Sequence, residues 1–125
     1  MDLCDYSKED IKMDSFTKLR DDERVKEAMQ YMQEHYDENI SLEDIARATM
    51  ISRSELCKSF RRAVDTSPKE FLIQYRIRQS MLLLEKPELR IADISEMTGF
   101  SSPSHFGSSF RSYVGCTPLQ YRKNM

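Results

Sequence analysis

Apolar residues recur at helical spacing along most of the chain. Val25, Met29, Met32 and Tyr36 follow one another at intervals of four, three and four residues, which gathers them on one face of a helix. Further stripes of this kind, separated by turn residues, occur downstream. They predict seven helices, at about residues 23–36, 42–49, 53–64, 68–84, 92–98, 103–113 and 118–123. The fold class expected from this pattern is all-α.

Most of these helix starts carry recognisable caps. Four hydroxyl residues are followed three positions later by an acidic or amide residue, so each pair can bond the free N–H groups of a first helical turn. The pairs are Ser41 and Asp44, Ser52 and Glu55, Ser67 and Glu70, and Thr117 and Gln120. Three helices also begin with proline, which needs no N–H partner there, at Pro68, Pro103 and Pro118.

The same pattern occurs twice in the chain, over residues 42–75 and 91–122. Asp44-Ile45 corresponds to Asp93-Ile94 at an offset of 49, and after one inserted residue the offset becomes 50. The pairs matched at that offset are Leu56 and Phe106, Phe60 and Phe110, Arg61 and Arg111, Val64 and Val114, Pro68 and Pro118, and Phe71 and Tyr121. In each copy a short helix leads through a tight turn into a longer helix, which is the helix-turn-helix arrangement.

The longer helix of each copy has an apolar side and a polar side. The residues expected in the core are Leu56, Phe60, Ala63 and Val64 in the first copy, and Phe106, Phe110, Tyr113 and Val114 in the second. The residues on or beside the polar side are Ser54, Cys57, Lys58, Arg61 and Arg62, and then Ser104, His105, Gly107, Ser108, Arg111 and Ser112. Small polar and basic side chains suit a helix that enters the major groove of DNA. An ordinary solvated face would explain either helix alone, but two copies at a fixed separation favour a long partner such as DNA.

The net charge of −2 is unevenly distributed along the chain. Residues 1–40 hold 6 Lys/Arg and 12 Asp/Glu, a net −6, whereas residues 41–125 hold 13 and 9, a net +4. The repeated part is therefore basic, as a nucleic-acid-binding surface requires. Residues 1–22 carry many charges and no sustained apolar period, so we interpret them as a flexible acidic tail or linker.

Other classes of function have little support in the residues. Cys4, Cys57 and Cys116 lack metal-binding spacing and are expected to be free thiols in a reducing cytoplasm. His35 and His105, the two histidines, lack the partners of a catalytic site, and no phosphate-binding glycine loop occurs. No apolar run approaches the ~20 residues of a membrane span. We therefore expect neither an enzyme nor a cofactor, a metal site or a membrane protein.

A set of motifs in the chain matches a known family. The set comprises Ile40-Ser41-Leu42 to Ile45-Ala46, Arg90-Ile91 to Asp93-Ile94, Gly99-Phe100, Phe106, Phe110-Arg111, Gly115, Thr117-Pro118 and Tyr121-Arg122. It strongly resembles the AraC/XylS transcription regulators over about residues 23–123. The resemblance implies two helix-turn-helix subdomains joined by a long helix, sequence-specific promoter binding and control of transcription. It also implies base contacts, by Ser54, Cys57 and Lys58 in the first recognition helix and by Ser104, His105 and Ser108 in the second.

Residues and resemblance together predict a regulator whose two recognition helices enter successive major grooves of a promoter site. The expected subdivision is a tail at 1–22, a first subdomain at 23–66, a linker helix at 67–86 and a second subdomain at 87–125. The expected DNA-contacting residues are Arg53, Ser54, Cys57, Lys58, Arg61, Arg62, Ser102, Ser104, His105, Ser108 and Arg111. Double-stranded DNA and RNA polymerase are the expected partners, and any oligomerisation is expected through a sensor domain absent from this chain.

Two departures from the family pattern refine this expectation. Met50 stands in the first turn, where glycine or a similarly adaptable residue is common, so strain is expected there. Gly107 and Ser108 give the second recognition helix short side chains, so the second half is expected to discriminate bases less than the first. The alternatives are a helical protein–protein adaptor without DNA binding and the DNA-targeting module of a modification enzyme. The acidic first residues favour the C-terminal part of a longer regulator over a stand-alone protein.

Overall fold

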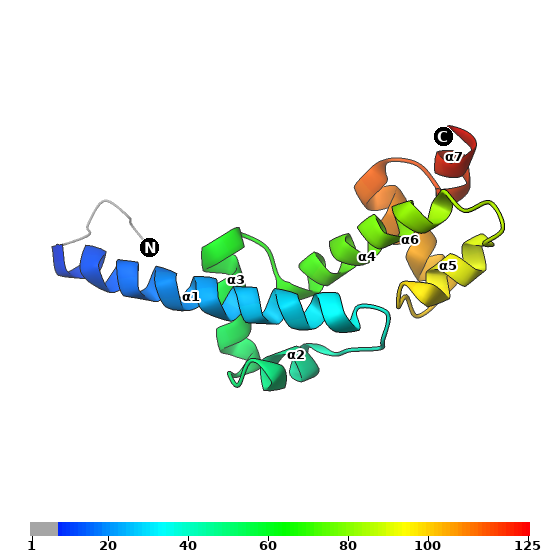
Figure 1. Cartoon of the computed structure of the whole chain (residues 1–125). Helices are drawn as coiled ribbons and strands as arrows, with labels where there is room; N and C mark the ends of the chain where they lie inside the picture. Colours follow the sequence, from blue (N-terminus) through cyan, green and yellow to red (C-terminus); the bar gives the residue numbers. More distant parts are fainter. Residues whose placement is uncertain (1–7) are drawn as a thin grey trace.

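The computed structural model describes residues 8–125, with side chains from residue 16 onward, and this part of the chain contains helices and no strand. The helices are α1 (Lys8–His35), α2 (Leu42–Ala48), α3 (Arg53–Val64), α4 (Pro68–Leu84), α5 (Ile91–Met97), α6 (Pro103–Val114) and α7 (Pro118–Lys123). The predicted all-α class is confirmed, and every helix after the first lies within one residue of its expected bounds. Figure 1 shows α1, α2 and α3 at one end, α5, α6 and α7 at the other, and α4 between them.

The helices pack around two separate hydrophobic clusters. The buried residues of the first cluster are Val25, Ala28, Met32, Ile45, Ala46, Leu56, Phe60 and Leu72. Those of the second are Ile77, Leu84, Ile94, Phe100, Phe106 and Phe110. One helix, α4, contributes to both, because Leu72 lies in the first cluster while Ile77 and Leu84 lie in the second. The pairs α2–α3 and α5–α6 therefore form two helix-turn-helix units on a shared helix.

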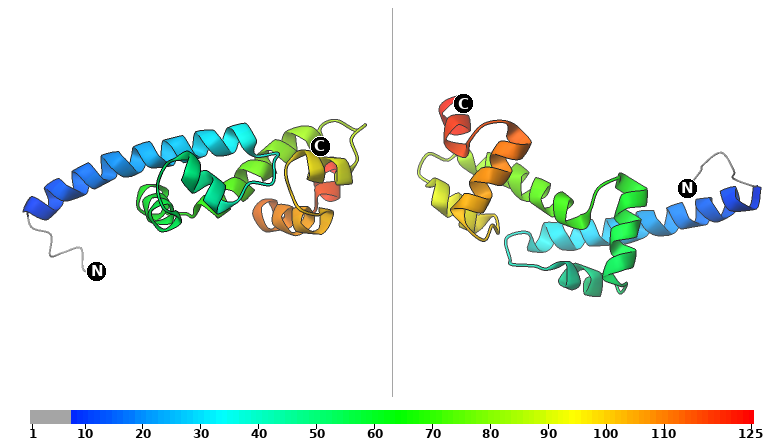
Figure 2. Two further views of the ribbon diagram at one scale, coloured as in Figure 1. Left: turned by 90° about the horizontal axis from the view of Figure 1, so that it is seen from below. Right: turned by 180° about the vertical axis from the view of Figure 1, so that it is seen from behind.

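The second helices of the two units, α3 and α6, lie on the same side of the molecule, opposite α1 (Figure 2). Phe60 and Phe110 anchor them, and both side chains are completely buried, as predicted. Two residues expected in the core are not there: Val64 is 42% exposed and Tyr113 is 39% exposed. Each lies in the last turn of its helix and faces away from the core, whereas Val114, next to Tyr113, packs against the second cluster. The Tyr113 hydroxyl instead donates a hydrogen bond to Glu70 of α4.

The start of α1 differs most from expectation. The sequence predicts a tail or linker through residue 22 and a first helix from about residue 23, but α1 begins at Lys8, so the predicted start of that helix is wrong. Residues 1–7 lie outside the described part of the chain. Lys, Arg and Glu are good helix formers, so a missing apolar stripe shows only that a helix does not pack against a core there. Phe16 and Leu19 are accordingly 70% and 65% exposed.

The predicted helix caps are present, but their acidic partners have different roles. Ser41, Ser52, Ser67 and Thr117 each accept the N–H three positions later. The reciprocal bond to the cap residue's own N–H occurs for Asp44 and Gln120. Glu55 and Glu70 point away from their caps, because Glu55 bonds arginines and Glu70 bonds Tyr113. The caps thus set the helix starts, and two of the glutamates join helices together.

The turns of the two units differ at one pair of positions. Met50 and Gly99, 49 residues apart, both adopt the left-handed conformation, with φ of 58° and 83°. Met50 is 90% exposed, so its side chain extends into solvent. A Cβ on Gly99 would collide with the Tyr36 carbonyl oxygen and lie 2.9 Å from Arg76 Nε. The second turn therefore requires glycine, whereas the first tolerates methionine despite its backbone conformation.

Replacing Met50 with glycine should stabilise the protein. The left-handed conformation costs a non-glycine residue about 1–2 kcal/mol, and the greater freedom of glycine in the unfolded chain offsets part of that gain. We expect a net increase of about 0.5–1 kcal/mol in the free energy of unfolding, seen as a melting temperature higher by a few degrees. Met50→Ala keeps the strain and is the control. An equal rise in Met50→Ala would show that the exposed side chain, and not the backbone, was responsible.

Candidate nucleic-acid interface

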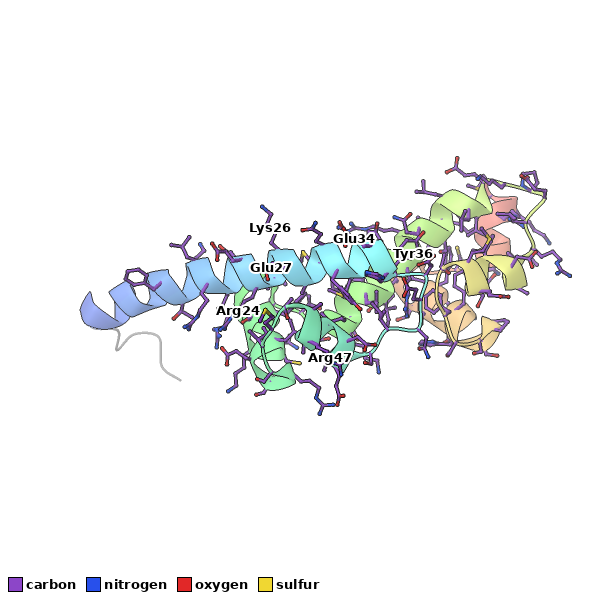
Figure 3. All side chains as sticks on the ribbon, turned by 60° about the horizontal axis from the view of Figure 1, so that its bottom comes forward. Arg24, Lys26, Glu27, Glu34, Tyr36 and Arg47 are labelled. Carbon is purple, nitrogen blue, oxygen red and sulfur yellow. The ribbon has the colours of Figure 1, made fainter. Side chains whose placement is uncertain are left out.

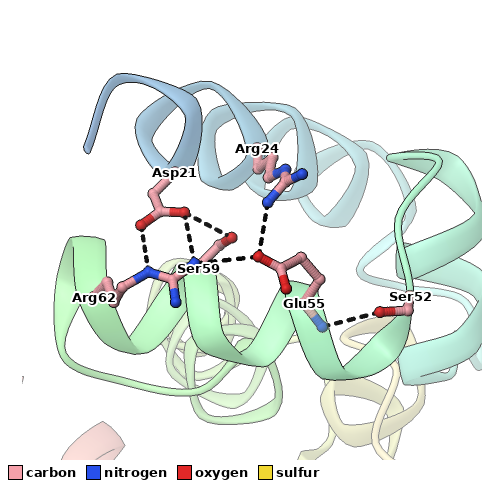
Figure 4. A network of polar contacts seen from close by, with 6 residues as sticks. All are labelled: Asp21, Arg24, Ser52, Glu55, Ser59 and Arg62. Atoms are coloured by element: carbon pink, nitrogen blue, oxygen red, sulfur yellow. Dashed lines mark hydrogen bonds and ion pairs between the residues drawn. The ribbon is translucent and has the colours of Figure 1, made fainter. Parts of the chain in front are cut away.

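A polar network fixes α3 to α1 (Figure 4). Asp21 of α1 is 1% exposed and accepts hydrogen bonds from Arg62 Nε at 2.7 Å and Nη2 at 3.1 Å. Ser59 donates a third bond to the same carboxylate at 2.9 Å. Glu55 of α3 accepts from Arg24 of α1 at 3.0 Å and from Arg62 at 3.2 Å. Because these bonds are directional, they set the rotation of α3 about its axis as well as its position.

The network keeps its carboxylates ionised. Hydrogen bonds from Arg62 hold the pKa of Asp21 below its ordinary value of 3.8, although burial acts in the opposite direction. For Glu55, loss of water would raise the pKa, but hydrogen bonds from Arg62 and Arg24 outweigh it and leave the pKa lowered. The contact between α1 and α3 is therefore made by charged groups at neutral pH.

The basic residues of α3 differ in the ion pairs that they form. Lys58 is exposed and forms no ion pair among the residues that the structure describes. Arg61 Nη1 lies 3.7 Å from Asp65 Oδ1, and both side chains are largely exposed. Such surface pairs contribute little stability and open readily. Arg62 differs from both, because its guanidinium is shared between two carboxylates of the α1–α3 network.

The other predicted residues of α3 lie along a groove between α2 and α3. Arg53, Ser54 and Cys57 line it from α3, and Arg47 lines it from α2. Figure 3 shows Arg47 on the side of the molecule away from α1. Arg53 Nη1 is 3.3 Å from Glu43 Oε1 in a pair whose members are about 60% exposed (61% and 62%). The structure therefore brings together a hydroxyl, a thiol and two guanidinium groups along one edge of α3.

The second recognition helix presents a less basic surface. Ser104, Ser108 and Arg111 of α6 are exposed, and His105 is half-buried. The Ser102 side chain is committed to capping, since its Oγ accepts the His105 N–H at 3.1 Å. Ser108 Oγ donates to the His105 carbonyl at 3.3 Å. Arg111 is thus the one arginine or lysine of α6, whereas α3 carries four.

Sequence patterns missed the two α1 residues that hold α3. Asp21 stands one turn before Val25, in register with the buried residues Ala28 and Met32. The apolar stripe of α1, continued four residues before Val25, places the Asp21 carboxylate at a core position. Arg24 carries no such signal, because only the tertiary structure shows that its side chain faces α3 (Figure 3).

Thiols, metal ligands and membrane spans complete the description of the side chains. Cys57 and Cys116 are free thiols, as predicted, and Cys4 lies outside the described part. The described side chains form no group of three or more His, Cys, Asp or Glu that could hold a metal ion. None of the described helices is long and apolar enough to cross a membrane.

Two helix-turn-helix units on one shared helix, with their second helices on one side, define a DNA-binding protein of the double helix-turn-helix class. Known proteins agree with this class. The profile of a family described as a helix-turn-helix domain matches residues 45–124. The chain is 42% identical over 100 residues to the HTH-type transcriptional regulator YdeC of Bacillus subtilis (strain 168). It is 37% identical over 101 residues to the Msm operon regulatory protein of Streptococcus mutans.

Solved structures extend the similarity to the fold. An AraC-type regulator from Chromobacterium violaceum superposes with a TM-score of 0.76 and 29% identity, covering 82% of this chain and 92% of that one. The DNA-binding domain of AdpA, solved with a target DNA, gives 0.75 and 28% identity, covering 80% and 90%. The chain belongs to the family of AraC-type helix-turn-helix transcription regulators and has its DNA-binding fold. It spans 34% and 36% of the length of the Bacillus and Streptococcus relatives, which match 80% and 81% of it.

Removing the buried carboxylate of the network should destabilise the protein. Asp21→Asn leaves Arg62 without its main partner, and we expect a loss of about 1–3 kcal/mol in the free energy of unfolding. Asp22→Asn removes the same charge from the exposed neighbouring residue and is the control. Because the folded pKa of Asp21 lies below 3.8, its contribution is complete above that pH and is lost as the pH falls through the folded value. Urea unfolding from pH 7 to pH 2 should therefore show parent and Asp21→Asn converging at the acid end. Equal stability of the two at pH 7 would contradict this role.

Proposed function

We propose that α3 and α6 enter successive major grooves on one side of a promoter duplex and that the chain thereby recognises a bipartite DNA sequence. The observation that carries this proposal is the placement of both helices on the side opposite α1 (Figure 2). Successive grooves on one side of B-DNA are about 34 Å apart, one helical turn. The long shared helix α4, of 17 residues, is a spacer of roughly 25 Å at 1.5 Å per residue. The difference between the length of α4 and the groove spacing is made up by the side chains of the recognition helices and by bending of the DNA.

Within α3, we propose different roles for the basic residues. Lys58 is free of carboxylates among the described residues, so it contacts a base or a phosphate directly. Arg53 and Arg61 exchange weak surface pairs for phosphates when DNA binds, at little cost. Arg62 remains bonded to Asp21 and holds α3 in the groove-facing orientation. Ser54 and Cys57 approach base edges as part of the same surface.

For α6, we propose that binding depends more on positioning than on base contacts. Ser104 and Ser108 have short side chains that reach phosphates and near base edges only. His105 is half-buried, and its backbone N–H donates a hydrogen bond to the side chain of the helix cap, Ser102. Arg111 supplies the phosphate contact that a helix of this kind needs. The half-site opposite α6 should accordingly tolerate more base changes than the half-site opposite α3.

The chain covers about a third of its relatives' length, so the activity of a longer protein is part of the proposal. We propose that it acts in the cytoplasm as the DNA-binding part of a transcription regulator and that RNA polymerase is a further partner. Any oligomerisation would involve a segment outside these residues. An adaptor without DNA binding is not favoured, because the relatives are transcription regulators and one structural neighbour was solved with DNA.

Selection of bound sequences from a random duplex pool tests the DNA site itself. We expect a bipartite consensus of about 20 base pairs, with its two halves about one helical turn apart. One half should be sharply defined and the other degenerate, because the two recognition helices differ in their side chains. A single half-site, or no enrichment over the starting pool, would contradict the proposal.

Removing the free lysine of α3 tests the assignment of that helix. Lys58→Ala should weaken binding to the selected duplex by about 1–3 kcal/mol and relax the preference at one base pair. A phosphate contact alone would weaken binding to all duplexes equally and reduce the salt slope by about one. The control is Lys26→Ala, which removes the same charge from the far side of α1 (Figure 3). Fluorescence anisotropy measures both variants, and parental affinity in Lys58→Ala would remove Lys58 from the interface.

A further inference from the structure

The two helix-turn-helix units meet at a polar contact centred on Arg76 of α4. Arg76 is 7% exposed, and its guanidinium donates from Nε to the Tyr36 carbonyl at 2.8 Å and from Nη2 to the Glu38 carbonyl at 2.8 Å. Tyr36 and Glu38 lie in the loop that follows α1, in the first unit. On the other side, the Arg76 guanidinium carbon lies 6.0 Å from the centre of the Phe100 ring, which belongs to the second unit. Arg76 therefore touches both units.

Gly99 completes this contact from the second unit. Its Cα approaches so closely that a Cβ would collide with the Tyr36 carbonyl oxygen, the same oxygen that Arg76 binds. Figures 1 and 2 show the loop after α1 beside the turn between α5 and α6. We refer to Tyr36, Glu38, Arg76 and Gly99 as the joint.

Next to the joint, the junction between the units is hollow. A cavity of about 310 Å³ is lined by Ile40 and Ile45 of the first unit, by Ile73 and Arg76 of α4, and by His105 of the second unit. Apolar side chains therefore do not fill the space between the two units there. The angle between the units depends on α4 and on the joint, because each unit has its own core.

The second unit contains the same kind of contact without the bridging role. Arg122 of α7 donates from Nε to the Leu84 carbonyl at 3.0 Å and from Nη2 to the Lys86 carbonyl at 3.0 Å. Both carbonyls follow or end α4, and Arg122 itself belongs to the second unit. Arg76 thus bonds the carbonyls that follow α1, and Arg122 bonds those at the end of α4. Arg76 differs because it also packs against the neighbouring unit.

We propose that the joint fixes the separation and relative rotation of α3 and α6 and thereby selects the spacing between the two halves of the DNA site. This inference rests on the proposed function. Arg76 and Gly99 are positioning residues, since neither lies on a recognition helix. One base pair added between the half-sites moves them about 3.4 Å apart and rotates them by roughly 35°. A rigid joint cannot follow that change, so the second unit loses its contacts.

Two matched pairs of variants test the joint. Arg76→Lys replaces the planar fork by a compact ammonium that cannot bond both carbonyls in the same way, and Arg122→Lys makes the same change in the contact that lies within one unit. Gly99→Ala drives a Cβ into the Tyr36 carbonyl, whereas Gly115→Ala adds a Cβ at another left-handed glycine, φ 96°, where it meets nothing within 4 Å. Each control thus carries the same chemical change or backbone strain as its partner.

Binding is measured on the selected bipartite duplex and on duplexes with one base pair inserted or deleted between the halves. For the parent, Arg122→Lys and Gly115→Ala, the altered spacing should weaken binding by about tenfold or more, since two tethered contacts gain affinity only where both can form. For Arg76→Lys and Gly99→Ala, the same change in spacing should reduce the binding affinity by less than about threefold. Joint variants that keep the parental spacing penalty would overturn the inference.

A distance measurement without DNA separates the joint from the proposed function. The three native cysteines of the full chain are changed to serine, and spin labels are attached at Ser54→Cys in α3 and Ser104→Cys in α6. Pulsed electron paramagnetic resonance then measures the distance between the two labels. The parent and Arg122→Lys should give one narrow distance distribution, and Arg76→Lys should give a broader one. Equal widths would overturn the joint even if DNA binds. Failure of the parent to bind any bipartite duplex would overturn the proposed function, while the distance distributions would still decide whether the joint is rigid.

Discussion

A single helix, α4, has to complete two hydrophobic cores, and the arrangement of the molecule depends on this constraint. Leu72 enters the first core, and Ile77 and Leu84 enter the second. Each unit therefore needs α4 to bury its apolar face completely, although the rest of each core comes from the unit's own helices. The helix-turn-helix units are therefore fixed to the same rod at positions that the spacing of three apolar residues determines. Their recognition helices reach one side of the molecule as a consequence.

Apolar packing alone would leave the helices free to rotate, and polar contacts remove that freedom. A hydrophobic contact is non-directional, whereas a carboxylate with three donors accepts only a narrow range of orientations. Asp21 provides such a contact for α3, and Arg76 provides one between the two units. Both side chains are almost completely buried, and each has its buried polar atoms satisfied. Their contribution is to orientation more than to stability, since burying a charge has a desolvation cost of its own.

The two units share a pattern but are not equivalent. The turn of the second unit presses against the Tyr36 carbonyl, which admits only glycine at position 99. The corresponding Met50 extends into solvent, so the first turn has no such restriction. The recognition helices also differ, because α3 carries four arginines or lysines and α6 carries one. Duplication thus supplied the framework, while the contacts that each copy makes account for the differences between them.

The sequence by itself determined the class, the positions of most helices and the duplicated unit. Caps and prolines are local signals, so six helices were predicted to within one residue, and Phe60 and Phe110 were found by their spacing. The residues of α3 and α6 that face outward follow from the same periodicity. Only the tertiary structure decided that Arg62 is held by Asp21 and that Arg76 contacts both units. These contacts depend on partners 38 or more residues away, as in the bonds of Asp21 to Ser59 and Arg62 and of Arg76 to Tyr36 and Glu38. Local spacing carries no information about such partners, because they meet only when the helices pack.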